Sequence, residues 1–231
     1  MIKRTRLGQH FLTSHSIAEK IVNAAKITKT ETVLEIGTGK GILINQLCKN
    51  AKKVISIDAD KKLYEDAKKQ FNNLPNLVLQ HGNGFKTGEK FDVFVSNLPY
   101  SKSRDAIEWL IQQKFDRAIM MVQKEFAEKI LSENEKRAIT ILSQYCLDVE
   151  KVLHVGKNNF HPPPKVDSIV LSLKHKRNLS LDVIHNVNRL FSYRRKTLQN
   201  ILKQFDIDSN SKQRLDELDG DEIIKIAQQI T

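Results

Sequence analysis

The chain has 231 residues and is 40% hydrophobic, enough for one sizeable core and a small appended subdomain. Its 38 Lys and Arg residues outnumber 27 Asp and Glu residues, and the charge of +11 favours nucleic acid as a partner and disfavours a small neutral substrate. No apolar run approaches the ~20 residues that span a bilayer, so we expect no membrane partner and a cytoplasmic location.

Apolar runs and helical stretches alternate over the first hundred residues. Four runs predict β-strands, and their nearly continuous apolarity is typical of a parallel sheet covered on both faces: residues 32–37, 53–58, 76–81 and 91–97. The segments between the first three runs carry apolar residues at helical spacing, such as Leu43 and Leu47, or Leu63 and Ala67. This βαβαβ order predicts an α/β fold with right-handed crossovers.

Three further apolar runs complete the predicted sheet, at residues 117–123, 145–155 and 168–175. Helices are expected around residues 106–113 and 125–143. After residue 178 the apolar period is purely helical. We therefore expect a seven-stranded, mostly parallel sheet over residues 1–175, followed by a small helical subdomain over residues 176–231.

The cysteines do not indicate a metal centre. Cys48 and Cys146 lie in apolar segments and match no metal-ligand spacing, so we expect both to be reduced and buried and predict no metal site. Three of the five prolines lie together in residues 160–168, just before the last predicted strand. This cluster indicates a rigid connection there.

Polar and glycine residues follow the first three strands. Gly37, Gly39 and Gly41 alternate after the first strand, where glycine lets the backbone take positive φ and approach a ligand. The dinucleotide fingerprint is incomplete, because residue 42 is Ile. Asp58 ends the second strand, where a carboxylate can bind both ribose hydroxyls, a pairing frequent among S-adenosylmethionine enzymes. Asn83 follows the third strand and could bond an adenine edge. Ordinary turns with surface polar residues are the alternative.

The stretch Asn97, Leu98, Pro99, Tyr100 follows the fourth strand at the edge where open α/β sheets bind ligands. An aromatic amine is a poor nucleophile because its lone pair is delocalised. The Asn97 side-chain oxygen and the Leu98 carbonyl could accept its two hydrogens and direct the lone pair at a methyl donor. Pro99 fixes φ, and Tyr100 offers a face for base stacking. A proline loop with a surface tyrosine is the alternative.

With these motifs the chain resembles the rRNA adenine N6-methyltransferase family, of the KsgA type that dimethylates two adjacent adenines near the 3′ end of small-subunit rRNA. The segments that carry the resemblance are LGQHFL, EIGTGKG, ISID, NLPY, FHPPPKVDS and LFSYRRKTLQN. The resemblance implies a class I, Rossmann-like methyltransferase that uses S-adenosyl-L-methionine. It also implies a role in small-subunit maturation, with rRNA of an immature ribosomal subunit as the partner and a monomer as the active form.

The resemblance implies roles for individual residues as well. The segment before residue 13 would fold over the cofactor, the glycine loop would touch its methionine end, and Tyr100 and Phe160 would enclose a flipped base. The implied cofactor site comprises Gln9, His10, Leu12, Gly37, Gly39, Gly41, Asp58, Asn83 and Asn97. The implied catalytic residues are Asn97, Leu98, Pro99 and Tyr100, and the candidates for RNA phosphate contacts are Lys165, Arg194, Arg195 and Lys196.

Two features depart from the family pattern. The family usually has Asp at position 83, so the uncharged Asn83 predicts weaker cofactor binding. The stretch 101–105 lacks a proline that commonly closes this turn, which leaves the local loop shape open. Three alternatives also remain: a large-subunit rRNA adenine methyltransferase of the erythromycin-resistance type, a ribosome assembly factor that binds RNA without needing catalysis, and a small-molecule methyltransferase.

Overall fold

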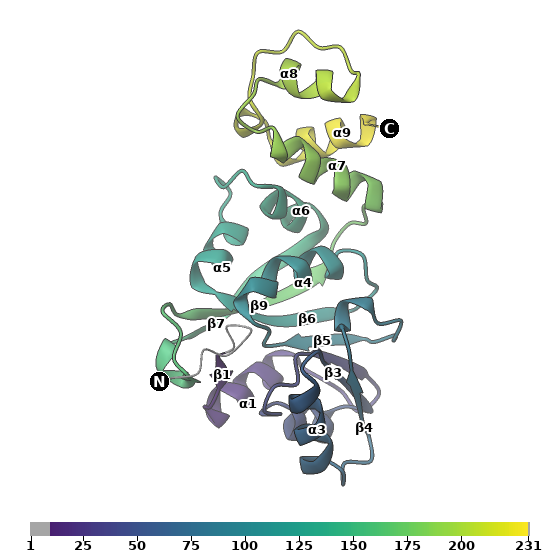
Figure 1. Cartoon of the computed structure of the whole chain (residues 1–231), viewed down its shortest axis with the longest axis vertical. Helices are drawn as coiled ribbons and strands as arrows, with labels where there is room; N and C mark the ends of the chain where they lie inside the picture. The colour runs from purple at the N-terminus through teal and green to yellow at the C-terminus, as the bar shows by residue number, and fades with distance from the viewer. Residues whose placement is uncertain (1–9, 231) are drawn as a thin grey trace.

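A seven-stranded sheet crosses the molecule in the computed structural model, which describes residues 10–230 (Figure 1). The strands are β1 (Phe11–Leu12), β2 (Thr32–Ile36), β3 (Lys53–Asp58), β4 (Leu77–His81), β5 (Val93–Ser96), β6 (Arg117–Gln123), β7 (Leu147–Val155), β8 (Phe160–His161) and β9 (Ser168–His175). The α-helices are α1 (His15–Ala24), α2 (Ile44–Asn50), α3 (Lys61–Gln70), α4 (Ser103–Leu110), α5 (Lys124–Leu131), α6 (Ala138–Cys146), α7 (Leu181–Ser192), α8 (Leu198–Leu202) and α9 (Gly220–Gln229).

The strand order of the main sheet is β4-β3-β2-β5-β6-β9-β7. Neighbours from β4 to β6 pair in parallel, whereas β9 runs antiparallel to both β6 and β7. The predicted seven-stranded, mostly parallel sheet is therefore confirmed. Its chain order reverses direction at β2, because β3 and β4 lie on one side of β2 and β5 on the other. A crevice beyond the carboxyl ends of the strands at such a point is where open α/β sheets bind ligands.

Both faces of the sheet are covered, which explains why its strands are apolar at consecutive positions. On β2, Val33 joins a cluster with α1, α2 and α3, while Leu34 joins a second cluster with α4, α5 and α6. Both side chains are fully buried. Successive residues of a strand point to opposite faces, so a sheet between two helical layers needs apolar residues on each. Cys48 and Cys146 are buried as predicted, one in each cluster.

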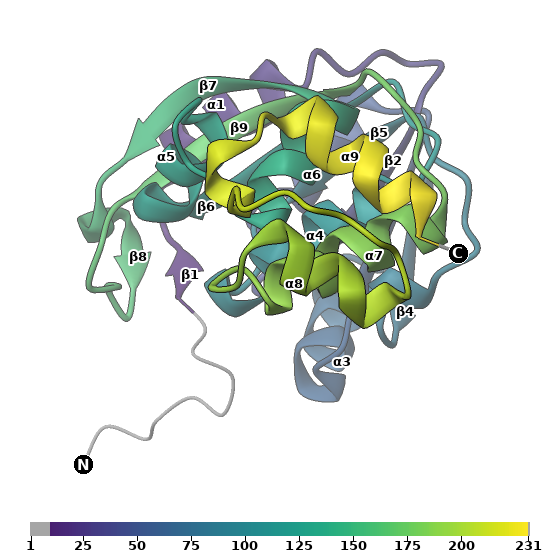
Figure 2. The same ribbon diagram turned by 90° about the horizontal axis from the view of Figure 1, so that it is seen from above.

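The tail after β9 forms a helical layer outside α6. Helices α7 and α9 pack on each other and on α6, and Figures 1 and 2 show this layer stacked over the α4 and α6 side of the sheet. The buried side chain of Asn186 on α7 donates hydrogen bonds to the carbonyls of Ala227 and Ile230, which closes the end of α9. Apolar side chains of the tail belong to the same core cluster as α4 and α6. The domain boundary at residue 175 stays a prediction.

Three features of the fold were not predicted from the sequence pattern. Strands β1 and β8 form a separate two-stranded antiparallel sheet of two residues each, too short to show any period. The helix expected over 125–143 is two helices, since α5 ends at Leu131 and α6 begins at Ala138. Helix α1, with a Ser14 cap on the Ile17 N–H, was also not predicted.

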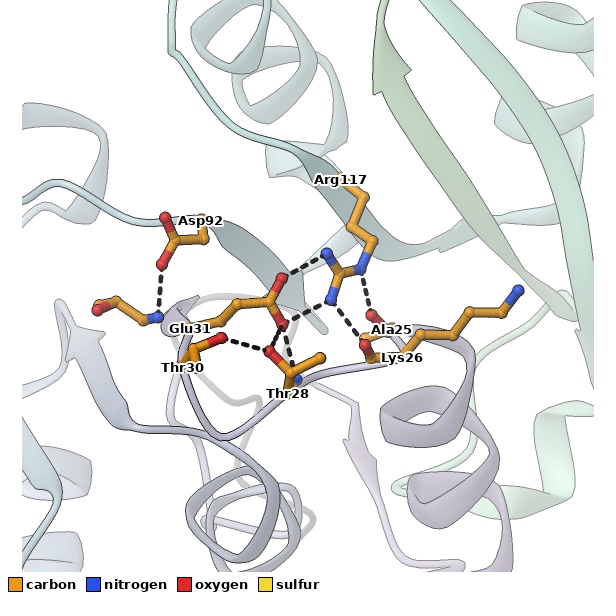
Figure 3. A network of polar contacts seen from close by, with 8 residues as sticks. Ala25, Lys26, Thr28, Thr30, Glu31, Asp92 and Arg117 are labelled. Atoms are coloured by element: carbon orange, nitrogen blue, oxygen red, sulfur yellow. Dashed lines mark hydrogen bonds and ion pairs between the residues drawn. The ribbon is translucent and has the colours of Figure 1, made fainter.

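A polar network fixes the amino end of the sheet (Figure 3). Arg117, at the start of β6, makes a two-pronged contact with the carboxylate of Glu31 at 2.7 and 2.8 Å and donates to the carbonyls of Ala25 and Lys26. These contacts hold the connection between α1 and β2. The Arg117 guanidinium, together with the backbone and hydroxyl donors of Thr28, lowers the pKa of Glu31 to about 2. This network lies at the amino edge of the sheet, opposite the carboxyl edge where open α/β sheets bind ligands.

No helix within residues 10–230 is long and apolar enough to cross a membrane. Across the same residues, no group of three or more His, Cys, Asp and Glu side chains is arranged to hold a metal ion.

Candidate cofactor and active site

A cavity of about 370 Å³ opens beyond the carboxyl ends of β2, β3 and β5. Its lining includes seven of the nine residues predicted for cofactor binding. The seven are His10, Leu12, Gly37, Gly39, Asp58, Asn83 and Asn97. These residues come from five segments of the chain, and the four segments at the carboxyl ends of β2, β3, β4 and β5 are brought to one edge by the parallel strands.

The backbone of the loop after β2 can lie close to the cavity because the loop is rich in glycine. Gly37 and Gly39 have φ values of +89° and +57°, a region that side chains with a Cβ rarely adopt. A Cβ on Gly37 would lie 3.1 Å from the side chain of Leu98. Gly41 allows Phe71 to pack closely instead, because a Cβ on Gly41 would lie 2.2 Å from the ring of Phe71. Gly41 is not among the described residues that line the cavity.

Asp58 joins the glycine loop to the end of β3. One carboxylate oxygen accepts the N–H of Gly39 and the other accepts the N–H of Asp60, both at 2.8 Å. Burial raises the pKa of this carboxyl, and the two backbone donors oppose that rise. A carboxylate has about four acceptor positions, so Asp58 keeps acceptor capacity toward the cavity. It can hold the loop and bind ligand hydroxyls at the same time.

Glu35 is a site residue that was not predicted from the sequence. It lies at the end of β2, lines the cavity and is 2% exposed. Its carboxylate accepts the Ser56 hydroxyl at 2.5 Å, and Ser56 in turn lies 2.6 Å from the hydroxyl of Thr38. Burial, with a further contribution from the charge of Asp58, raises the pKa of Glu35 to about 8. A glutamate inside an otherwise apolar strand was the signal that could have revealed it.

Asn83 begins the short 3-10 helix Gly84–Lys86 after β4. Its side-chain oxygen accepts the N–H of Phe85 at 3.1 Å, so the amide is held in one orientation with its NH₂ group available. Phe85 lines the cavity beside it. An apolar ring next to an amide is a suitable wall for a planar base.

The Asn97–Tyr100 segment leaves β5 at the mouth of the cavity. The Ser96 hydroxyl donates to the carbonyl of Ile36 at 2.9 Å, which fixes the end of β5 against β2. Asn97, Leu98 and Pro99 then line the cavity. Helix α4 begins soon after, at Ser103, so the stretch left open by the family pattern forms a turn into a regular helix.

Tyr100 is fixed at the edge of the cavity rather than in its lining. Its hydroxyl lies 2.7 Å from the hydroxyl of Ser168, which is fully buried, and its ring stacks beside His10 with centroids 5.9 Å apart. Burial raises the pKa of the Tyr100 phenol. The phenol is therefore neutral at physiological pH, and one part of the ring already contacts an aromatic partner.

The segment after Gln9 lines the cavity with His10, Phe11 and Leu12. Gln9 itself lies outside the described residues. His10 lies 2.7 Å from the carbonyl of Pro162 through Nδ1, and β1 pairs with β8, with Leu12 opposite Phe160. Phe160 is 4% exposed and packs in the α1 and α2 core cluster; it is not among the described residues that line the cavity. Its contact with a target base stays a prediction.

The predicted RNA contacts lie away from this cavity. Lys165 is exposed in the loop before β9, and Arg194, Arg195 and Lys196 are exposed in the turn after α7. The turn lines a surface hollow of about 420 Å³ together with Phe191. The structure therefore brings three of the four predicted basic residues together on the tail.

Comparison with known proteins shows to which family the chain belongs. The family model described as ribosomal RNA adenine dimethylase matches residues 2–228. Ribosomal RNA small subunit methyltransferase A of Clostridium botulinum is 37% identical over 232 residues, which is 93% of this chain and 84% of that protein. The protein of the same name from Thermotoga maritima is 35% identical over 209 residues, covering 87% of this chain and 75% of that one.

Solved structures agree with the fold. A dimethyladenosine transferase from Plasmodium falciparum has a TM-score of 0.79 at 32% identity and covers 94% of this chain and 96% of its own. The 23S rRNA methyltransferase ErmE has a TM-score of 0.69 at 20% identity, covering 95% and 99%, which supports the fold alone. The chain belongs to the ribosomal RNA adenine dimethylase family, whose members are S-adenosylmethionine-dependent methyltransferases.

Proposed function

We propose that the protein dimethylates the exocyclic amines of two adjacent adenines near the 3′ end of small-subunit rRNA. The observation that carries this proposal is the position of Asn97, Leu98 and Pro99, which line the same cavity as the glycine loop and Asp58. This arrangement puts the acceptors for an amine beside the residues suited to a nucleoside cofactor. The names of the two relatives and of the Plasmodium structure support adenine in small-subunit rRNA as the target.

The residues of the cavity fit S-adenosylmethionine, which supplies an electrophilic methyl group on a sulfonium. Gly37 and Gly39 give close backbone approach, and Asp58 keeps acceptor positions for ribose hydroxyls after binding two backbone N–H groups. Asn83 and Phe85 offer an amide and a ring to the adenine. His10 and Leu12 line the cavity, and in this proposal they fold over the cofactor together with Gln9.

In the proposed mechanism Asn97 and Leu98 activate the amine by holding it. The Asn97 side-chain oxygen and the Leu98 carbonyl accept the two amine hydrogens, so the nitrogen lone pair points away from the ring plane and into the cavity. Pro99, with φ −52°, keeps the two acceptors in place without offering an N–H of its own. The alkylated amine is acidic and loses its proton afterwards, so no general base is required.

Tyr100 and Phe160 are proposed to receive the flipped base. The Tyr100 ring is fixed through its hydroxyl by Ser168, and a fixed ring loses little freedom when a base stacks on it. Phe160 is buried on β8, opposite Leu12 of β1, and in this proposal it encloses the base from the side opposite Tyr100. Unstacking the target adenine costs a few kcal/mol, which stacking on Tyr100 would offset.

The substrate is proposed to be rRNA within an immature small subunit, bound by a monomer in the cytoplasm. The net charge of +11 supports attraction to RNA. Lys165, Arg194, Arg195 and Lys196 are proposed to contact phosphates, and all four are exposed. Such contacts would position the RNA while the cavity selects the base.

Asn97→Ala tests the catalytic assignment. We expect methylation of unmethylated small subunits to fall ~100-fold or more, as when one stabilising polar group is removed from a reacting centre, while affinity for S-adenosylmethionine falls less than tenfold. Asn73→Ala, an exposed asparagine in the loop after α3, is the matched control and should change neither. Equal losses of methylation and of cofactor affinity in Asn97→Ala would assign Asn97 to cofactor binding alone and contradict the proposed mechanism.

A further inference from the structure

Helix α4 brings an ion pair to the wall of the cofactor cavity. Lys102, just before the helix, and Asp105, in its first turn, both line the cavity, and the Lys102 Nζ lies 2.8 Å from the Asp105 Oδ2. The pair belongs to the segment that directly follows Asn97–Tyr100. The proposed methyl transfer uses neither charge, so the pair has no role in the reaction itself.

Trp109 shows at which end of the cavity Asp105 lies. Residues four apart share a face of a helix, so Asp105 lies one turn before Trp109 on that face of α4. The buried ring of Trp109 packs against Phe85, with centroids 5.8 Å apart. Phe85 follows Asn83 by two residues and lines the cavity with it. Asp105 therefore lies at the end of the cavity where the adenine is proposed to bind.

Asp105 has an oxygen available to a ligand. Its Oδ2 accepts the Lys102 ammonium, and from residues 10–230 its Oδ1 accepts no hydrogen bond. The side chain is 49% exposed, so a molecule in the cavity can reach this oxygen without any change in the helix. A carboxylate only accepts hydrogen bonds, so the ligand group that meets it must be a donor.

The adenine amine of S-adenosylmethionine is such a donor. It carries two hydrogens and can therefore use two acceptors. Asn83 can supply one, because its side-chain oxygen accepts the Phe85 N–H at 3.1 Å and keeps one further lone pair. A second acceptor has to come from another wall of the cavity, and the Asp105 carboxylate is a charged acceptor on the wall formed by α4.

We propose that Asp105 accepts a hydrogen bond from the adenine amine of the cofactor and makes the cavity selective for adenine over a base without that amine. Lys102 holds the other carboxylate oxygen and does not contact the amine, since both groups are donors. The inference rests on the proposed cofactor site and adds to it a residue not predicted from the sequence. Hydrogen bonds to a charged acceptor are about twice as strong as those between neutral groups, so Asp105 contributes more to recognition of the amine than Asn83.

Calorimetric titration of the full chain with two analogues of the cofactor tests the inference. The analogues are S-adenosylhomocysteine and S-inosylhomocysteine, in which an oxygen replaces the amine. Asp105→Ala should lower the ratio of the two affinities about tenfold, which is the effect of losing one hydrogen bond to a charged group. The adenine compound should bind more weakly, whereas the inosine compound should bind equally or more tightly, because its oxygen faces the carboxylate in the unaltered protein.

Lys102→Ala is the matched variant, because it breaks the same ion pair and leaves the carboxylate in place. It should keep most of the affinity ratio. Equal falls of the ratio in Lys102→Ala and Asp105→Ala would overturn the inference, since Asp105 would then act only as the partner of Lys102. Asp66→Ala removes an exposed acid from α3 and should leave both affinities unchanged. Equal weakening of both compounds in Asp105→Ala would also overturn the inference.

The titrations contain no RNA, so they separate the inference from the proposed rRNA specificity. If the unaltered protein binds neither compound, the proposed cofactor site fails and the inference fails with it. If it binds both compounds and the affinity ratio is the same in Asp105→Ala, the inference alone fails. Absence of methylation of small subunits would leave the measured ratio unaffected.

Discussion

Glu35→Gln should stabilise the protein at neutral pH. Glu35 is 2% exposed and its pKa is raised to about 8, chiefly by burial. The folded protein therefore binds a proton that the unfolded chain releases above its ordinary pKa of 4.5. Stability contributed by this proton is fully present below 4.5 and is lost as the pH rises toward 8. Glutamine has no proton to lose, and it can still accept the Ser56 hydroxyl.

The size of the effect follows from the shift. Each pH unit between the unfolded and folded pKa values costs about 1.4 kcal/mol. From 4.5 to pH 7 the penalty reaches about 3 kcal/mol, and little of it remains at pH 5. Because the side chain is almost completely buried, solvent screening reduces this figure little. A change of this size is a large fraction of the stability of an ordinary domain, about 5–15 kcal/mol.

Denaturant unfolding between pH 5 and pH 8 measures the difference. The variant should equal the unaltered protein at pH 5 and exceed it by a growing margin toward pH 8. Glu65→Gln, which changes an exposed glutamate on α3, should show no such trend. A constant difference between Glu35→Gln and the unaltered protein across this range would refute the view that Glu35 is protonated in the fold.

Three further predictions concern other parts of the molecule. Arg117→Ala should cost up to about 3 kcal/mol at pH 7, because Arg117 is the largest of the causes that lower the Glu31 pKa to about 2, beside the donors of Thr28; unfolding at pH 7 and pH 2 should show that the unaltered protein loses most of this contribution in acid and that the variant loses less. Asn83→Asp should raise S-adenosylmethionine affinity severalfold, as measured by calorimetry, because the carboxylate supplies the charge that Asn83 lacks and still accepts the Phe85 N–H; unchanged or weaker binding would count against this prediction. Tyr100→Phe should cost ~1 kcal/mol through the lost contact with Ser168 but keep most methylation, whereas Tyr100→Ala should lower methylation at least tenfold; equal activity losses would assign the role to the hydroxyl.

The main sheet could be predicted from the sequence because the apolar pattern of each strand lies within its own residues. Buried parallel strands need apolar residues on both faces, and runs such as 53–58 show this directly. The cavity followed from the same reasoning, since Gly37, Asp58 and Asn97 each come after the carboxyl end of a strand and must meet at one edge. Their contacts with cofactor and substrate stay predictions.

Other features depend on contacts between distant residues. Strands β1 and β8 are defined by pairing across about 150 residues, and two residues have no measurable period. The break between α5 and α6 falls in a polar stretch without glycine or proline, so propensity gave no sign of it. Lys136 and Arg214 line the same surface crevice because the tail packs on α6. Glu35 differed from these, because a charge within an apolar strand was visible in the sequence.

Mapping of dimethyladenosine tests the central claim most directly. The full chain is incubated with labelled S-adenosylmethionine and either unmethylated small subunits or large-subunit RNA, and the modified positions are then sequenced. We expect dimethyladenosine at two adjacent adenines near the 3′ end of small-subunit rRNA, with none formed by Asn97→Ala. Label in large-subunit RNA alone, or none in either RNA despite measured cofactor binding, would contradict it.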